Sequence, residues 1–411
     1  MGKDVILTVR NPMQLAYDPA KGLVDDGEVA LRLLNGPIAK DLIGFSWLGS
    51  GYDLRDLPTD WRWDAQWGGE YGALPGPSLL MASRMPMAIL SGLAAGLVFL
   101  LGRALGGNFT GLAACLLYAL DPLVLVHGRR AMAEGALLFS LLLSLVATVE
   151  LARRLRRRPR WEWLWNIMLT ALLGGVIAFA ISSKQTNAPV LFVAIVACAS
   201  AVVRRPGVRT AESLTRAGVI VAVLVFACGT VFLLLNPVAW RSPLRTAGAM
   251  IAIRDIQTRA QIESVIADGR PQDVLTTVGS RAVAAVDNSF GMPAFWDVPK
   301  YAEYLEPQRE AYYSFPLTRL LREWPLNVGL AVLCVLGLLA SVARMVKTPT
   351  ERDAEGVLIG WLISAVILIV VAIPLNWQRY FVSALPPIWF YAALGLGVVG
   401  QSARGLLWRR G

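Results

Sequence analysis

Two adjacent carboxylates, Asp25 and Asp26, open the stretch of this sequence with the clearest capacity for chemistry. Glu28 follows two residues later and leads into an apolar helical run. A carboxylate can act as a general base that removes a proton from a hydroxyl group. A helix cap is the alternative role, but a cap explains one acid, and two neighbouring charges repel each other. We therefore treat Asp25 and Asp26 as the candidate catalytic pair.

A second group of charges follows a break in an apolar run at Asp121. Arg129 and Arg130 come next, and Glu134 lies one helical turn beyond Arg130. Charged side chains at membrane depth are usually functional or paired with each other. We expect Glu134 to orient Arg129 or Arg130. The alternative is an ion pair between Arg130 and Glu134 in which the two charges only neutralise each other.

Two further short turns each hold a cation. Lys184 lies in one, and Arg379 lies in the other, followed by Tyr380. Cations gathered at one membrane face below an acidic segment suggest a site for a phosphate at headgroup level. Each cation alone can instead extend to a lipid phosphate. The candidates for binding a donor phosphate are Arg129, Lys184, Arg379 and Tyr380.

The sequence offers few side chains that could bind a metal or form a disulfide. His127 is the single histidine, and the four cysteines all fall within apolar runs. We therefore expect no disulfide and no zinc site, and we interpret His127 as a packed or interfacial ring. A divalent cation beside Asp25 and Asp26 is the one metal that we keep as an option.

The elements that must position these residues are membrane helices. The chain has 411 residues, 55% of them hydrophobic, and its apolar runs approach the roughly 20 residues that cross a bilayer. We predict an all-α polytopic membrane protein. The expected spans are residues 85-103, 108-126, 132-152, 162-182, 187-203, 217-236, 325-344, 356-375 and 380-402.

Arginine placement predicts the orientation of these spans. The net charge of +10 is concentrated in short loops on one side, which argues against nucleic-acid binding and marks that side as cytoplasmic. The expected organisation is an extracytoplasmic segment with the acidic loop, then transmembrane helices, a long extracytoplasmic loop, and further transmembrane helices with a cytoplasmic tail. These four parts are residues 1-84, 85-236, 237-324 and 325-411. Since residues 1-22 lack a long apolar run, we also expect an apolar span encoded upstream.

The motifs together resemble the GT-C glycosyltransferases, specifically the superfamily of protein mannosyltransferases and aminoarabinose transferases. Asp25-Asp26 is similar to the acid pair of the family's first outer loop, with Asp in place of the usual Glu. Arg129 and Glu134 match its Arg followed five residues later by an acid. Lys184 matches the end of one family span, and Arg379-Tyr380 matches the C-terminal pattern.

The resemblance implies a membrane glycosyltransferase of the GT-C fold, in the plasma membrane of a bacterium and acting in cell-envelope or protein glycosylation. It would transfer a sugar with inversion from a polyprenyl-phosphate donor to a protein or glycan acceptor outside the membrane. Asp25 would act as the base and Asp26 as its partner, and no nucleotide-binding motif is needed. The rivals are a transporter or flippase of lipid-linked saccharides and a non-catalytic scaffold.

Overall fold

The fold is all-α, as the sequence predicts. The computed structural model describes residues 4–23, 27–57, 75–157, 162–204, 210–290, 306–307, 310–311, 313–316, 324–347 and 352–408. Within these ranges the regular structure is helical, and the one isolated β-bridge joins Val274 to Leu375. Asp25 and Asp26 lie outside the described residues.

Eight helices of the described ranges are long and apolar enough to cross a membrane, which makes the chain an integral membrane protein. They are α5 (Pro77–Leu120), α7 (Glu134–Arg157), α8 (Trp163–Ser183), α9 (Pro189–Val203), α10 (Thr210–Leu235), α15 (Trp324–Lys347), α16 (Arg352–Ala372) and α17 (Leu385–Trp408). The span of α9 includes the turn before it and begins at Gln185.

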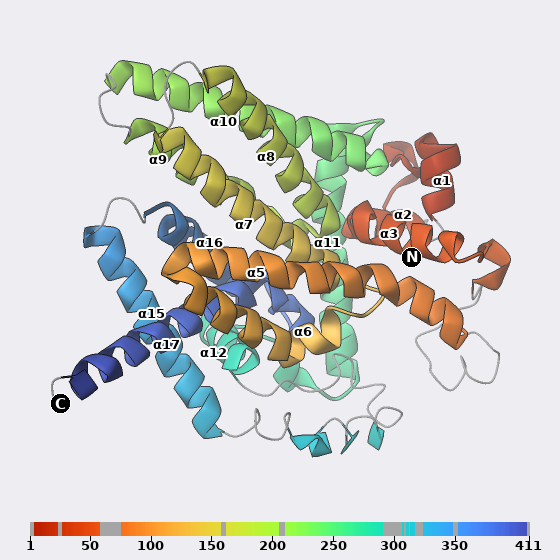
Figure 1. The fold of residues 1–411 in the computed structure, drawn as a ribbon. Helices are drawn as coiled ribbons and strands as arrows, with labels where there is room; N and C mark the ends of the chain where they lie inside the picture. Colours follow the sequence, from red (N-terminus) through yellow and green to blue (C-terminus); the bar gives the residue numbers. More distant parts are fainter. Residues whose placement is uncertain are drawn as a thin grey trace.

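Helix α5 accounts for two of the predicted crossings. Its 44 residues would extend about 66 Å if straight, twice the roughly 30 Å of a bilayer core. Gly106 and Gly107 leave helical geometry, and Gly107 has φ 84°, a value that glycine adopts without steric strain. The chain reverses there, so α5 runs to one end of the bundle and returns (Figure 1).

The returning half of α5 ends earlier than the predicted span 108-126. Asp121 accepts hydrogen bonds from the backbone N–H groups of Leu123 and Val124, and so caps a separate short helix, α6 (Pro122–His127). Proline at the first position of a helix needs no N–H partner, which favours a new start there. The span therefore stops at Leu120, and residues Pro122–His127 form a separate short helix at the end of the bundle.

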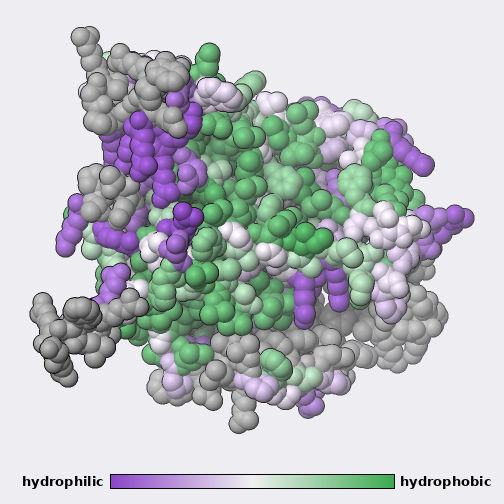
Figure 2. Space-filling model, viewed as in Figure 1, coloured by the Kyte–Doolittle hydropathy of each residue, from purple (hydrophilic) through white to green (hydrophobic). Residues whose placement is uncertain are grey.

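The bundle has inner and outer helices. Most of the apolar stretches of α7 and α17 are buried, whereas α10 and α15 are largely exposed, as expected for helices that face lipid. Helix α17 packs against α15 and α5, and α7 packs against α5, α8 and α9. Green hydrophobic residues form a band across the molecule between purple hydrophilic ends (Figure 2).

The two ends of the bundle differ in composition. At the arginine-rich end, α7 finishes with Arg154, Arg156 and Arg157, α9 leads into Arg204, and α15 finishes with Arg344 and Lys347. The opposite end carries helices that are too short or too polar to count as spans. They are α1 (Asp4–Arg10), α2 (Gly27–Leu34), α3 (Pro37–Gly49), α11 (Pro243–Ala267) and α12 (Val278–Phe290).

These shorter helices are packed onto the bundle and onto one another. Helix α11 covers α2 through a small apolar core that includes Leu33, Leu34, Ala249 and Ile253. Helix α3 packs against α5 and α8, and α12 packs against α16. Segments far apart in the sequence thus share one end of the bundle, as the loop pattern predicts.

Candidate functional site

An ion pair links two membrane helices at the end opposite the arginine-rich end. The Nζ atom of Lys184 donates a hydrogen bond of 2.8 Å to Oε1 of Glu134. Glu134 is the first residue of α7, and its side chain is only 3% exposed. Its second oxygen, Oε2, has no hydrogen-bond partner among the described residues. A buried carboxylate requires compensation, and Lys184 supplies it.

The position of Lys184 is fixed by the turn that contains it. Lys184 is the C-cap of α8 and has extended backbone geometry, with φ −157° and ψ 131°. Three residues on, the side-chain amide of Asn187 donates to the carbonyl oxygens of Leu137 and Ala180. Asn187 thereby ties the turn to both α7 and α8. Side-chain bonds of this kind to buried backbone oxygens restrain a turn strongly.

Basic side chains gather around Glu134. Lys184, His127 and Arg379 each interact electrostatically with the Glu134 carboxylate, so each lies near it. His127 ends α6 and is buried, and Arg130 lies 3.4 Å from its Nδ1 atom. The expectation of a packed histidine ring is confirmed by this burial.

Arg379 lies on aromatic rings in the turn between α16 and α17. Its guanidinium carbon is 4.9 Å from the ring centroid of Trp377 and 5.6 Å from that of Tyr380. Such stacking holds a guanidinium in place while its N–H groups keep their capacity to donate. The Tyr380 hydroxyl itself donates to Oε1 of Gln261 in α11 at 3.1 Å. Tyr380 therefore also connects the Arg379 turn to the outer helices.

A short backbone pairing fixes the same turn from outside the bundle. The backbone N–H of Leu275 donates to the Pro374 carbonyl, and that of Asn376 donates to Asp273. The side chain of Asn288 in α12 adds a hydrogen bond of 2.7 Å to Asn376. The segment from α11 to α12 thus positions the Arg379 turn, a contribution that no local sequence signal revealed.

Arg129 differs from the other cations. It is exposed, and within the described residues it takes part in no hydrogen bond or ion pair of its side chain. It lies two residues after α6, which Asp121 anchors a second time by accepting a hydrogen bond of 2.8 Å from the indole of Trp389. An exposed arginine that follows an anchored helix can present its charge to an anion.

The expectation that Glu134 orients Arg129 or Arg130 needs a correction. The ion pair of Glu134 is with Lys184, and the contact of Arg130 is with His127. The physical reason is the close packing of α7 against α8, which brings the end of one helix to the start of the other. Spacing along a single helix does not contain that information.

Helix α2 brings the segment that follows the acid pair to the Lys184 turn. The side-chain amide of Gln185, the residue after Lys184, donates to the carbonyl oxygen of Leu33 at 3.0 Å. Gly36 packs so closely that a Cβ atom there would lie 1.9 Å from the carbonyl oxygen of Ser182. Only glycine permits this approach. The helix whose first residue follows Asp26 is therefore fixed against the end of α8.

No group of three or more His, Cys, Asp or Glu side chains suited to a metal ion occurs within the described residues. Asp25 and Asp26 are not among them. The cysteines at positions 115, 198, 228 and 334 are free thiols.

Comparison with known families places part of this site within one match. The family model described as dolichyl-phosphate-mannose-protein mannosyltransferase matches residues 32–251. That range covers α3 to α10, including Glu134 and Lys184. A comparison with curated proteins finds no match.

Solved structures with a similar chain trace include an oligosaccharyltransferase of Archaeoglobus fulgidus. The apo form is 18% identical, with a TM-score of 0.48, over 92% of this chain and 44% of that one. The AglB complex with an inhibitory peptide and a dolichol-phosphate is 17% identical, with a TM-score of 0.44, over 92% and 43%. The complex with Zn and sulfate is 17% identical, with a TM-score of 0.43, over 90% and 41%. The chain thus spans less than half the length of these proteins.

Proposed function

The chain belongs to the dolichyl-phosphate-mannose-protein mannosyltransferase family, and from this premise we propose that it is an inverting glycosyltransferase. Its donor would be a sugar linked to a polyprenyl phosphate, and its acceptor a hydroxyl group of a protein or glycan. The reaction would take place at the membrane face that carries α2, Lys184 and Arg379. The transporter or flippase of lipid-linked saccharides is the alternative that the experiment below tests.

One observation carries the proposal: the hydrogen bond from Gln185 to Leu33 joins α2, the helix that follows the acid pair in the sequence, to the Lys184 turn. Asp25 and Asp26 directly precede α2, and α2 is fixed beside Lys184. A base and a set of phosphate-binding cations are the two components that transfer from a lipid phosphate requires. A transporter would have a use for the cations but none for a general base.

The proposed step is a single displacement. The acceptor oxygen bonds to the anomeric carbon of the sugar, the bond from that carbon to the phosphate oxygen breaks, and the acceptor proton moves to Asp25. Asp26 orients Asp25 or the acceptor. Attack from the face opposite the leaving phosphate inverts the anomeric configuration.

The cations have the complementary task of stabilising the departing polyprenyl phosphate. Lys184, Arg379 and Arg129 offer ammonium and guanidinium donors, and charge-assisted bonds to phosphate are about twice as strong as neutral ones. The ion pair with Glu134 holds the Lys184 side chain in place, so Glu134 acts on the phosphate only through Lys184. Tyr380 and Arg130 position their neighbours, Arg379 and His127.

The orientation follows from the arginine-rich end, which the positive-inside rule assigns to the cytoplasm. The site then lies on the extracytoplasmic face, and a bacterial plasma membrane suits a polyprenyl carrier. A divalent cation beside Asp25 and Asp26 stays part of the proposal, and no step above depends on it.

Replacing Asp25 by Asn tests the proposal, because it removes the base and keeps the shape of the side chain. Turnover should fall by about 10²–10⁴-fold while binding of the polyprenyl-phosphate sugar is retained. The matched control is Asp18→Asn, in the same outer segment, where the carboxylate caps a short turn. Sugar transfer from a labelled donor is measured alongside donor binding in the purified full chain.

The same variants separate enzyme from transporter. In reconstituted vesicles, movement of a fluorescent lipid-linked saccharide across the bilayer is measured with and without Asp25→Asn. The alternative would replace the proposed function if two results were found together. The wild-type chain would show no transferase activity, and the Asp25→Asn variant would still transport the saccharide. Normal transferase turnover in Asp25→Asn would remove Asp25 from the role of base.

A further inference from the structure

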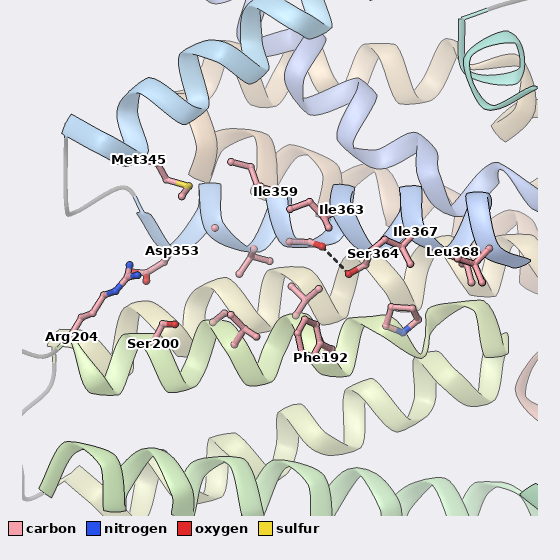
Figure 3. A pocket seen from close by; sticks show the side chains of 18 of the residues that line it. Phe192, Ser200, Arg204, Met345, Asp353, Ile359, Ile363, Ser364, Ile367 and Leu368 are labelled. Atoms are coloured by element: carbon pink, nitrogen blue, oxygen red, sulfur yellow. Dashed lines mark hydrogen bonds between the residues drawn. The ribbon is translucent and has the colours of Figure 1, made fainter. Parts of the chain in front are cut away.

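A groove of about 710 Å³ lies between α9 and α16. Apolar side chains line most of its length, among them Phe192, Val196, Ile363 and Ile367. Figure 3 shows Phe192 on α9 facing the isoleucines of α16 across it. A volume of this size is typical of sites for small ligands rather than of packing defects.

One end of the groove is polar and positively charged. Arg156, Arg204, Ser200 and Asp353 line it, and Arg204 and Asp353 point toward one another there (Figure 3). Asp353 is ion-paired with Arg156. The other end, near Pro189, Val371 and Ala372, offers only apolar side chains.

Positive charge exceeds negative charge at the polar end. The single Asp353 carboxylate is influenced by four arginines, namely Arg153, Arg156, Arg157 and Arg204. Arg153 is also paired with Glu150, so among these described residues four arginines are set against two acids. The excess of cations at a membrane surface attracts an anionic headgroup, and Arg204 is exposed to meet it.

We propose that this groove binds an anionic membrane phospholipid, with its phosphate beside Arg204 and its acyl chains between α9 and α16. The polarity of the groove favours this occupant. Its charged end lies at the arginine-rich end of the bundle, whereas a donor phosphate would lie at the opposite end beside Lys184. A lipid anchored beside Arg204 belongs to the other leaflet. The site does not rest on the transfer reaction.

The bound phospholipid also has a structural consequence. Helix α9 begins five residues after Lys184, and α16 ends seven residues before Arg379. A lipid that fills the space between these helices sets their lateral separation in the membrane. The spacing of the two cationic turns at the far end then depends on the occupant of the groove.

Two variants address the two halves of the groove. Arg204→Glu reverses the charge at the polar end. Gly356→Leu fills the groove, since Gly356 lines it and a Cβ atom there meets nothing within 4 Å. Lys347→Glu is the matched control, because Lys347 is an exposed cation at the same end and does not line the groove.

The experiment uses the full chain reconstituted in nanodiscs of phosphatidylcholine with a small fraction of phosphatidylglycerol. Native mass spectrometry after mild detergent extraction counts the lipids that each chain retains. The wild type should retain phosphatidylglycerol in preference to phosphatidylcholine. Arg204→Glu should lower the retained phosphatidylglycerol by about tenfold, and Gly356→Leu should lower it as well. Lys347→Glu should match the wild type.

Other outcomes overturn the proposal. Equal retention of both phospholipids by the wild type would mean no headgroup site, and an equal loss in Lys347→Glu would mean a general surface effect. The groove would be assigned to the donor chain by a different pair of results. Added polyprenyl phosphate would displace phosphatidylglycerol from the wild type, and its retention would be lost in Gly356→Leu but kept in Arg204→Glu. A size-exclusion profile and a melting temperature for each variant ensure that only folded chains are compared.

Discussion

Lys184, which caps the end of α8, is ion-paired at 2.8 Å with Glu134, which begins α7 fifty residues earlier. The pair has two separable consequences. It compensates a buried carboxylate, and it holds an ammonium group at the face where we propose the donor phosphate binds. A structural pair and a phosphate site make different demands on Lys184, so they can be distinguished by mutation.

Glu134→Gln should destabilise the chain, because it leaves the Lys184 cation without its carboxylate. The loss can reach about 3–5 kcal/mol, the range for breaking a buried pair. Adding Lys184→Gln should recover part of the melting temperature, since no charge is then left uncompensated. Donor affinity should fall below that of the wild type in the double variant, because the phosphate then lacks Lys184. A double variant that recovers stability and keeps wild-type donor affinity would show that the pair is purely structural.

A pH effect on stability is expected from Asp41 in α3. Burial raises the pKa of the Asp41 carboxyl from its ordinary 3.8 to about 6, and Thr8 is its hydrogen-bond donor at 3.4 Å. Because the folded-state pKa is the higher one, the stabilising contribution is complete below about pH 4 and is lost as the pH rises through about 6. Asp41→Asn stays neutral and should remove this dependence.

Melting temperatures between pH 4 and pH 7 test that expectation in the purified chain. The control is Asp255→Asn, an exposed aspartate of α11 paired with Arg259. It should reproduce the wild-type profile. If Asp41→Asn also reproduces it, the carboxyl of Asp41 titrates at its ordinary pKa in the folded protein.

The membrane helices could be predicted from the sequence because lipid imposes a simple rule on composition and length. The reversal of α5 at Gly106 and Gly107 falls within the turn expected between the first two spans. The grouping of distant loops at one end also follows from alternation of the spans. The bridge from Val274 to Leu375 could not be predicted, since a single β-bridge leaves no periodic pattern.

The sequence nominates charged residues for the candidate site but does not give their pairing. Charged residues in short turns between apolar runs are easily recognised in the sequence, and Lys184 and Arg379 are candidates for that reason. The partner of Glu134 was predicted from spacing along one helix, and that spacing favours Arg130. The actual partner depends on how α7 and α8 pack. Gln185 and Asn187, which fix the turn, are ordinary polar residues without a sequence signal of their own.

Membrane orientation can be tested with a cysteine at position 289. Ser289 lies in α12, on the end opposite the arginines. Ser289→Cys should react in intact cells with a membrane-impermeant maleimide, because the positive-inside rule places that end outside. Lys347→Cys, on the arginine-rich end, should react only after permeabilisation. The reverse labelling pattern would place the proposed site in the cytoplasm.

Arg379 gives the sharpest test of the phosphate site. Arg379→Ala removes a guanidinium that rests on Trp377 and Tyr380. A charge-assisted hydrogen bond contributes about 1.5–3 kcal/mol, so the dissociation constant for a polyprenyl phosphate should rise by about 10- to 100-fold. Turnover should fall as well, since the leaving phosphate loses the same partner.

Two comparisons decide whether that effect belongs to the phosphate. Arg241→Ala, which removes a half-exposed arginine paired with Asp18 at the same end, should leave donor affinity unchanged. Arg379→Lys keeps the charge and loses the planar fork, so it should restore only part of the affinity. Affinity measured by titration of polyprenyl phosphate against intrinsic tryptophan fluorescence separates these cases. If Arg379→Ala binds the donor as tightly as Arg241→Ala, then Arg379 has no part in holding the phosphate, and the cationic site reduces to Lys184 and Arg129.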